Sequence, residues 1–185
     1  MNISPQQAAD ALRDIELTES HSRQLHQYQS GSSILFLWGV IWMIGYGVTG
    51  YSHKALIWIP LSVIGMLATF MLSRKFRHHY TPADWKVRGR KFGLSWVVIF
   101  AFISSVYAVM QPHNPNVFAA FPALMVAFSY GIAGALFLPR YLWLGIAVFA
   151  LTLTGFFYVA DGYNYWMAVV GGGALMLGGL WLRKA

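Results

Sequence analysis

The sequence contains no cysteine, and only 10% of its 185 residues are charged. The absence of cysteine excludes disulfides, thiolate nucleophiles and cysteine-ligated metal sites. An ordinary soluble domain carries about a quarter charged residues. In contrast, 57% of this chain is hydrophobic, which is more than a soluble core of this length can hide. The composition therefore indicates a membrane protein before any single segment is considered.

The chain also lacks the motifs of the common catalytic centres. It has no G-x-S-x-G, no phosphate-binding glycine loop and no H-E-x-x-H. Its first thirty residues lack the basic start and short apolar core of a secretory signal. The histidines lie outside the apolar runs and are not spaced as haem or metal ligands. We therefore predict no catalytic residue, no metal site and no cofactor, and we expect that the protein is not an enzyme.

Long hydrophobic runs are what the sequence has in abundance. A run of about 20 apolar residues is long enough to cross a bilayer. Because backbone groups in lipid must be hydrogen-bonded within their own segment, runs of this length form helices. We predict an all-α integral membrane protein with six transmembrane helices. The predicted spans, none with an ionisable residue in its interior, are about 33–51, 55–73, 92–110, 117–138, 141–160 and 165–182.

Charge is distributed unevenly along the chain. The stretch 74–91 holds seven of the thirteen Lys and Arg residues, whereas the turns at 111–116 and 161–164 hold none. Because short loops rich in Lys and Arg stay cytoplasmic, we predict that this basic loop and both termini lie inside the cell, in a bacterial inner membrane. Such a loop is expected to contact anionic headgroups, and no nucleic-acid-binding module accompanies it. Its basic residues are Arg74, Lys75, Arg77, Lys86, Arg88, Arg90 and Lys91.

The short turns predict that consecutive spans pair as three helical hairpins. Each second helix carries proline or glycine in its outer half, and in transporters such interruptions at corresponding positions mark a binding site near the midplane. The same residues are frequent in membrane helices generally and also mark helix contacts. The densest polar spot in any span, at 104–107, is a further candidate pocket lining. The candidate pocket or helix-break positions are Pro60, Ser104, Ser105, Tyr107, Pro122, Gly171, Gly172 and Gly173.

The segment 1–31 is the most distinctive part outside the predicted spans. Ser4, Pro5 and Gln7 form a capping-box start, and "SGSS" at 30–33 is expected to end this helix before the first span. The segment carries four acidic and two basic residues, whereas a helix that lies on anionic lipid is basic. We therefore expect a short cytoplasmic helix that meets the basic loop or a protein partner, or that is merely solvated. Its acidic residues are Asp10, Asp14, Glu16 and Glu19.

Two functions remain open from these patterns. The first is an interaction or regulatory role, in which the acidic lead 1–31 and the basic loop 74–91 engage a cytoplasmic protein. This interpretation fits the absence of ionisable groups within the spans, which pumps and coupled transporters usually retain. The alternative is a channel or facilitator for a small neutral or weakly polar solute. Either function is compatible with a homo-oligomer.

Overall fold

The computed structural model describes residues 5–75 and 82–184, and these residues form helices and short turns. The first five helices are α1 (Pro5–Ser52), α2 (Trp58–Lys75), α3 (Pro82–Met110), α4 (Pro115–Leu136) and α5 (Pro139–Tyr158). The last helical stretch comprises α6 (Tyr163–Trp166), a π-helical segment (Met167–Gly171) and α7 (Gly172–Arg183). Short 3₁₀ turns, Ala55–Ile57 and Ala160–Gly162, precede α2 and α6.

Within residues 5–75 and 82–184, six helical stretches are long and apolar enough to cross a membrane, as the sequence predicted. They are Gln27–Ser52, Ala55–Ser73, Gly93–Met110, Pro115–Leu136, Pro139–Tyr158 and Tyr163–Arg183. The all-helical class and the number of candidate spans are therefore confirmed. These are the features expected of an integral membrane protein.

The amino-terminal lead and the first span are one helix, so the predicted helix end at 30–33 is wrong. α1 continues through this region for a total of 48 residues. A Cβ on Gly31 would collide with the side chain of Tyr141, and Ser32 is buried with its carbonyl facing Gly179. Packing against α5 and α7 therefore outweighs the weak helix propensity of glycine and serine.

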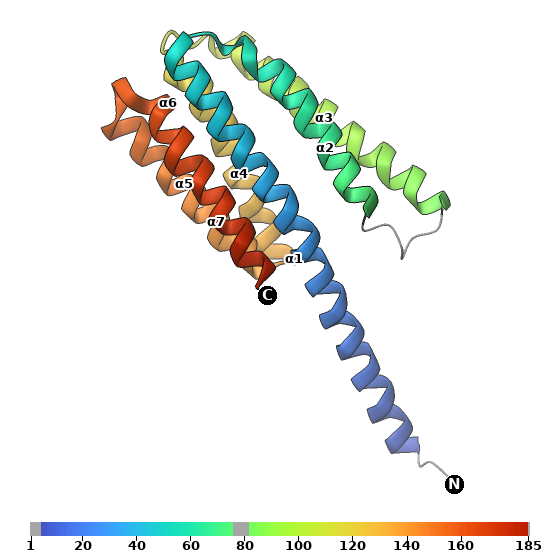
Figure 1. Ribbon diagram of the computed structural model, residues 1–185. Coiled ribbons are helices and arrows are strands. Elements are labelled where there is room, and N and C mark those ends of the chain that lie inside the picture. Colours follow the sequence, from blue (N-terminus) through green and yellow to red (C-terminus); the bar gives the residue numbers. More distant parts are fainter. Residues whose placement is uncertain (1–4, 76–81, 185) are drawn as a thin grey trace.

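Helices α1, α4, α5 and α7 form the packed part of the protein (Figure 1). The most extensive contacts join α4 to α5 and α1 to α7. α2 also packs on α1. However, Figure 1 shows that α2 and α3 move away from the other helices as they leave the turns that join them to α1 and α4. The three predicted hairpins are therefore not the main packing units of the described chain.

Small residues explain why these two helix pairs approach so closely. A Cβ on Gly145 of α5 would lie 2.7 Å from the Gly131 nitrogen and 2.8 Å from the Ala127 carbonyl oxygen of α4. A Cβ on Gly172 of α7 would lie 2.9 Å from the Gly39 carbonyl oxygen of α1. Helices in lipid associate through van der Waals contact, so residues without large side chains mark their interfaces.

We call the end of the bundle that holds the connections after α1, α3 and α5 the turn end, and the opposite end the C-terminal end. At the turn end, α1 and α3 are each followed by a residue with positive φ, His53 at 55° and Gln111 at 41°. α4 begins on Asn114, whose side chain accepts a 2.9 Å hydrogen bond from the Asn116 N–H, with Pro115 at the first helical position. These caps satisfy backbone groups that the helix ends leave open.

Candidate functional site

Three of the predicted positions do not meet in a pocket formed by the described residues. Pro60 is exposed and lies in the first turn of α2, where its missing N–H removes no bond from the helix interior. Ser104 and Ser105 are exposed on α3, and the Ser105 hydroxyl donates a 2.8 Å hydrogen bond to the Ala101 carbonyl of its own helix. These three residues therefore lie on outward faces of their helices.

The structure does bring together Tyr107 and Pro122. Pro122 lies inside α4 and has no N–H, so the carbonyl four residues earlier, that of Phe118, loses its helical donor. The Tyr107 hydroxyl of α3 donates a 2.7 Å hydrogen bond to this Phe118 carbonyl. A side chain from another helix thus satisfies the backbone group that the proline frees.

A second tyrosine caps the next carbonyl of the same turn. The Tyr46 hydroxyl of α1 donates a 2.8 Å hydrogen bond to the Ala119 carbonyl. The Tyr46 ring meets the rings of Trp42 and Trp58 edge-on, at centroid distances of 5.7 and 4.8 Å. The turn before Pro122 is therefore held from α1 and from α3 by two phenols.

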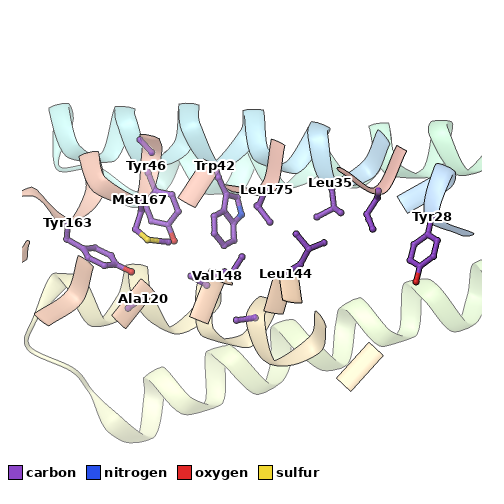
Figure 2. Close-up of a cluster of buried hydrophobic side chains, with 14 residues drawn as sticks. Tyr28, Leu35, Trp42, Tyr46, Ala120, Leu144, Val148, Tyr163, Met167 and Leu175 are labelled. Atoms are coloured by element: carbon purple, nitrogen blue, oxygen red, sulfur yellow. The ribbon is translucent and has the colours of Figure 1, made fainter. Parts of the chain in front are cut away.

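Tyr163 of α6 adds a third phenol near this turn. Figure 2 shows Tyr46, Met167 and Tyr163 gathered at one end of the buried core. Tyr46 and Tyr163 both belong to the buried core. Tyr163 is 1% exposed, and its hydroxyl has no hydrogen-bond partner among the described residues. We call Tyr46, Tyr107, Pro122 and Tyr163 the tyrosine–proline cluster.

The predicted glycines lie beside this cluster on the sixth span. Gly171 ends the π-helical segment, and a Cβ there would come within 3.6 Å of the Trp42 ring. Gly172 is buried against α1, whereas a Cβ on Gly173 would meet nothing within 4 Å. The main role of the triple glycine is therefore to let α1 approach closely. The π-helical segment that ends at Gly171 is of a kind that is frequent at functional sites.

A second cluster, which the sequence reasoning missed, ties the helices together at the C-terminal end. The Arg140 guanidinium carbon lies 5.5 Å from the Tyr28 ring centroid and 5.4 Å from that of Trp181, within cation–π range. The Tyr141 ring stacks on Tyr28 at 6.3 Å and approaches Tyr130 at 5.6 Å. We call these five residues the arginine cluster. They come from α1, α4, α5 and α7.

The sequence carried only a weak signal for the arginine cluster. Arg140 and Trp181 fit the ordinary pattern of basic and aromatic anchors at span ends. Tyr28 belongs to the segment 1–31, which the sequence places before the first predicted span, 33–51. Its burial, 4% exposed, follows from the continuation of α1 into the bundle.

The charged candidates can be placed only in part. Asp14 on α1 and Arg90 on α3 are exposed. Arg77 lies outside the described residues. The side chains of the other charged candidates also lie outside the described set, so their predicted interaction remains a prediction. They are Asp10, Glu16, Glu19, Arg74, Lys75, Lys86, Arg88 and Lys91.

Comparison with protein-family models, curated proteins and solved structures finds no match to this chain. Its functional interpretation therefore rests on its own residues. The two clusters offer hydrogen bonds from phenols, aromatic faces and one guanidinium. Within the part of the chain that the structure describes, no three His, Asp or Glu side chains gather as metal ligands.

Proposed function

We propose that this chain is a membrane-embedded interaction or regulatory protein that binds a cytoplasmic protein through its lead 1–31. One observation carries this proposal. Leu12 and Ile15, three residues apart on one face of α1, are 63% and 56% exposed. They lie well before Gln27, where the first candidate span begins, and large apolar side chains in water favour burial against a partner.

The continuity of α1 gives this binding a route into the bundle. Residues 5–26 precede the span and extend about 33 Å at the rise of an α-helix. Figure 1 shows this part of α1 running beyond the other helices. The same helix then supplies Tyr28 to the arginine cluster and Tyr46 to the tyrosine–proline cluster. A force or tilt applied to the lead would therefore reach both ends of the bundle.

The charge of the lead suggests the character of its partner. Four acidic and two basic residues in the lead favour a partner whose apolar groove has a basic rim. The loop 74–91 is basic as well. It would either compete with the partner for the acidic lead or, while it contacts anionic headgroups, support the partner's binding. This proposal requires both termini to lie inside the cell. The charge pattern favours this orientation, in a bacterial inner membrane.

A facilitator for a small neutral or weakly polar solute is the second candidate function. The observation in its favour is the buried Tyr163 hydroxyl without a hydrogen-bond partner, because buried polar groups ordinarily have one. A solute path also needs polar groups on several helices. Ser104 and Ser105 are exposed on α3 and do not supply them, so the interaction role has the stronger support.

The proposed binding face can be tested with matched double variants. The full chain, Leu12→Ser/Ile15→Ser and the control Gln6→Ala/Arg13→Ala would be purified in mild detergent, and retained proteins identified by mass spectrometry. Gln6 and Arg13 are exposed and lie roughly opposite Leu12 and Ile15 at about 100° per residue.

The expected result is a stoichiometric protein that is lost with the Leu12/Ile15 variant and kept by the control. Once purified, that protein should bind the full chain and the control variant but not the Leu12/Ile15 variant. Retention of the same proteins by all three forms would refute the proposed binding face. Retention of a small molecule alone by all forms would favour the facilitator.

A further inference from the structure

Three basic residues gather at the C-terminal end, where α5 begins and α7 ends. The Arg140 Nη1 group donates a 3.4 Å hydrogen bond to the Trp181 carbonyl. The Lys184 backbone N–H donates to this same carbonyl at 3.3 Å, which places Arg140 beside the end of α7. Arg183 and Lys184 are exposed, and Arg140 is half-buried. Arg183 and Lys184 therefore follow closely on the residue whose carbonyl Arg140 contacts, so all three basic residues lie at this end of the bundle.

This end of the bundle carries positive charge without a compensating carboxylate among the described residues. Asp161 lies at the turn end. Asp14 precedes Tyr28 on the continuous α1 by about 21 Å of helix. Both carboxylates are therefore too far away to pair with Arg140, and three cationic residues at one end of the bundle favour the binding of an anion.

Arg140 is held in a fixed position by its aromatic neighbours. Its guanidinium lies over the Tyr28 ring and over the Trp181 ring, and one N–H group is used by the Trp181 carbonyl. A guanidinium has five N–H donors in a planar fork that matches phosphate oxygens. A fixed fork loses little entropy when it binds a phosphate.

The surroundings of the three cations are apolar. Trp181 and Leu180 on α7 are 42% and 46% exposed, and Leu142 and Trp143 on α5 are 37% and 65% exposed. Exposed tryptophans are typical of the headgroup level of a bilayer, and leucines beside them suit acyl chains. A ligand that places a phosphate at these cations and acyl chains against these apolar side chains is a phospholipid.

We propose that Arg140, Arg183 and Lys184 form a binding site for the headgroup phosphate of an anionic phospholipid. The site lies between α5 and α7 and is distinct from the basic loop 74–91. It does not depend on the proposed protein partner. Basic pockets between membrane helices are known to favour anionic headgroups. Here the bound lipid would join the start of α5 to the end of α7, beside the arginine cluster.

The test uses a fluorescent label beside the site, because the basic loop would also attract anionic lipid. The full chain has no cysteine, so Leu180→Cys can be labelled selectively with bimane. Quenching would be measured in mixed micelles that contain equal fractions of spin-labelled phosphatidylglycerol or spin-labelled phosphatidylcholine. Two site variants, Arg183→Gln/Lys184→Gln and Arg140→Lys, would be compared with Lys54→Gln, which changes an exposed cation at the turn end.

The expected result is stronger quenching by phosphatidylglycerol than by phosphatidylcholine. Arg183→Gln/Lys184→Gln should lower this preference by about 25-fold, since each of the two surface cations contributes about a fivefold factor. Arg140→Lys should also lower it, because the planar fork is lost, and Lys54→Gln should leave it unchanged. Equal quenching by both lipids in the full chain, or an unchanged preference in Arg183→Gln/Lys184→Gln, would overturn the proposal. Displacement of the lipid by inorganic phosphate, but not by sodium chloride at matched ionic strength, would overturn the assignment to a lipid.

Discussion

At the scale of single residues, Pro122 is tolerated because a tyrosine replaces the hydrogen bond that it removes. The sequence singled out Pro122 and Tyr107 separately, one as a helix break and one as part of a polar spot. The structure joins them through the bond from the Tyr107 hydroxyl to the Phe118 carbonyl. No pattern along the chain could have paired them, since α3 and α4 are separate helices.

Tyr107→Phe should lower the free energy of unfolding in detergent by about 1 kcal/mol, because the Phe118 carbonyl is then left without its donor. In a Pro122→Ala background the loss should be smaller, because residue 122 regains an N–H that can bond to Phe118. A double-mutant cycle based on denaturant unfolding would measure this coupling. Ser105→Ala is the control, and additive losses in the cycle would contradict the proposed pairing.

Two neighbouring glycines should respond differently to alanine. At Gly172 the new Cβ would lie 2.9 Å from the Gly39 carbonyl oxygen and 3.1 Å from the Met43 nitrogen, so α1 and α7 must move apart. We expect a loss of about 1–3 kcal/mol in unfolding free energy. Gly173→Ala meets no atom within 4 Å, and it should be neutral or stabilising because alanine favours helix. Equal effects at both positions, measured by the same unfolding assay, would count against the close α1–α7 contact.

At the scale of helices, local propensity and tertiary packing disagree at 30–33. Gly31 and the serines around it are weak helix formers, and the sequence therefore predicted a helix end. The packing of Gly31 on Tyr141 and of Ser32 near Gly179 keeps α1 continuous. Pro60 shows that the position of a proline within a helix matters, because in the first turn of α2 it interrupts no interior bond.

The continuity of α1 can be measured with two spin labels. Thr18 and Met43 are exposed. Because the sequence contains no cysteine, cysteines introduced at these two positions would be the only thiols in the protein. Their Cα atoms lie 25 residues apart on one helix, which corresponds to about 38 Å. Pulsed electron paramagnetic resonance should show one narrow distance distribution near this value. A broad or much shorter distribution would restore the helix end that the sequence predicted.

At the scale of the whole molecule, the packed part consists of α1, α4, α5 and the sixth span, with α2 and α3 diverging from it (Figure 1). No described side chain of α3 is buried, although the Tyr107 hydroxyl bonds to α4 near the turn end. In water such an arrangement would expose large apolar faces. In a bilayer the acyl chains cover them at little cost.

The orientation of this molecule in the membrane remains a prediction of the charge pattern. A reporter fused at Asn114 should behave as extracytoplasmic, and one fused at Asp84 should behave as cytoplasmic, because the loop 74–91 holds seven basic residues. Alkaline phosphatase and fluorescent-protein fusions would read the two sides. The reverse result would place the arginine cluster, with its neighbours Arg183 and Lys184, on the outer side.

The sequence alone determined the helical class and the six candidate spans, because length and hydropathy are properties of each segment and lipid imposes helix on every one of them. It also singled out Tyr107 and Pro122 of the tyrosine–proline cluster, but neither Tyr46 and Tyr163 nor the contacts among the four residues. The tertiary structure decided that α1 packs on α7 and α4 on α5, that α1 continues through residue 31, and that Tyr28, Arg140 and Trp181 meet. These outcomes depend on the fit between surfaces far apart in the chain, and apolar segments of similar hydropathy do not specify their own neighbours.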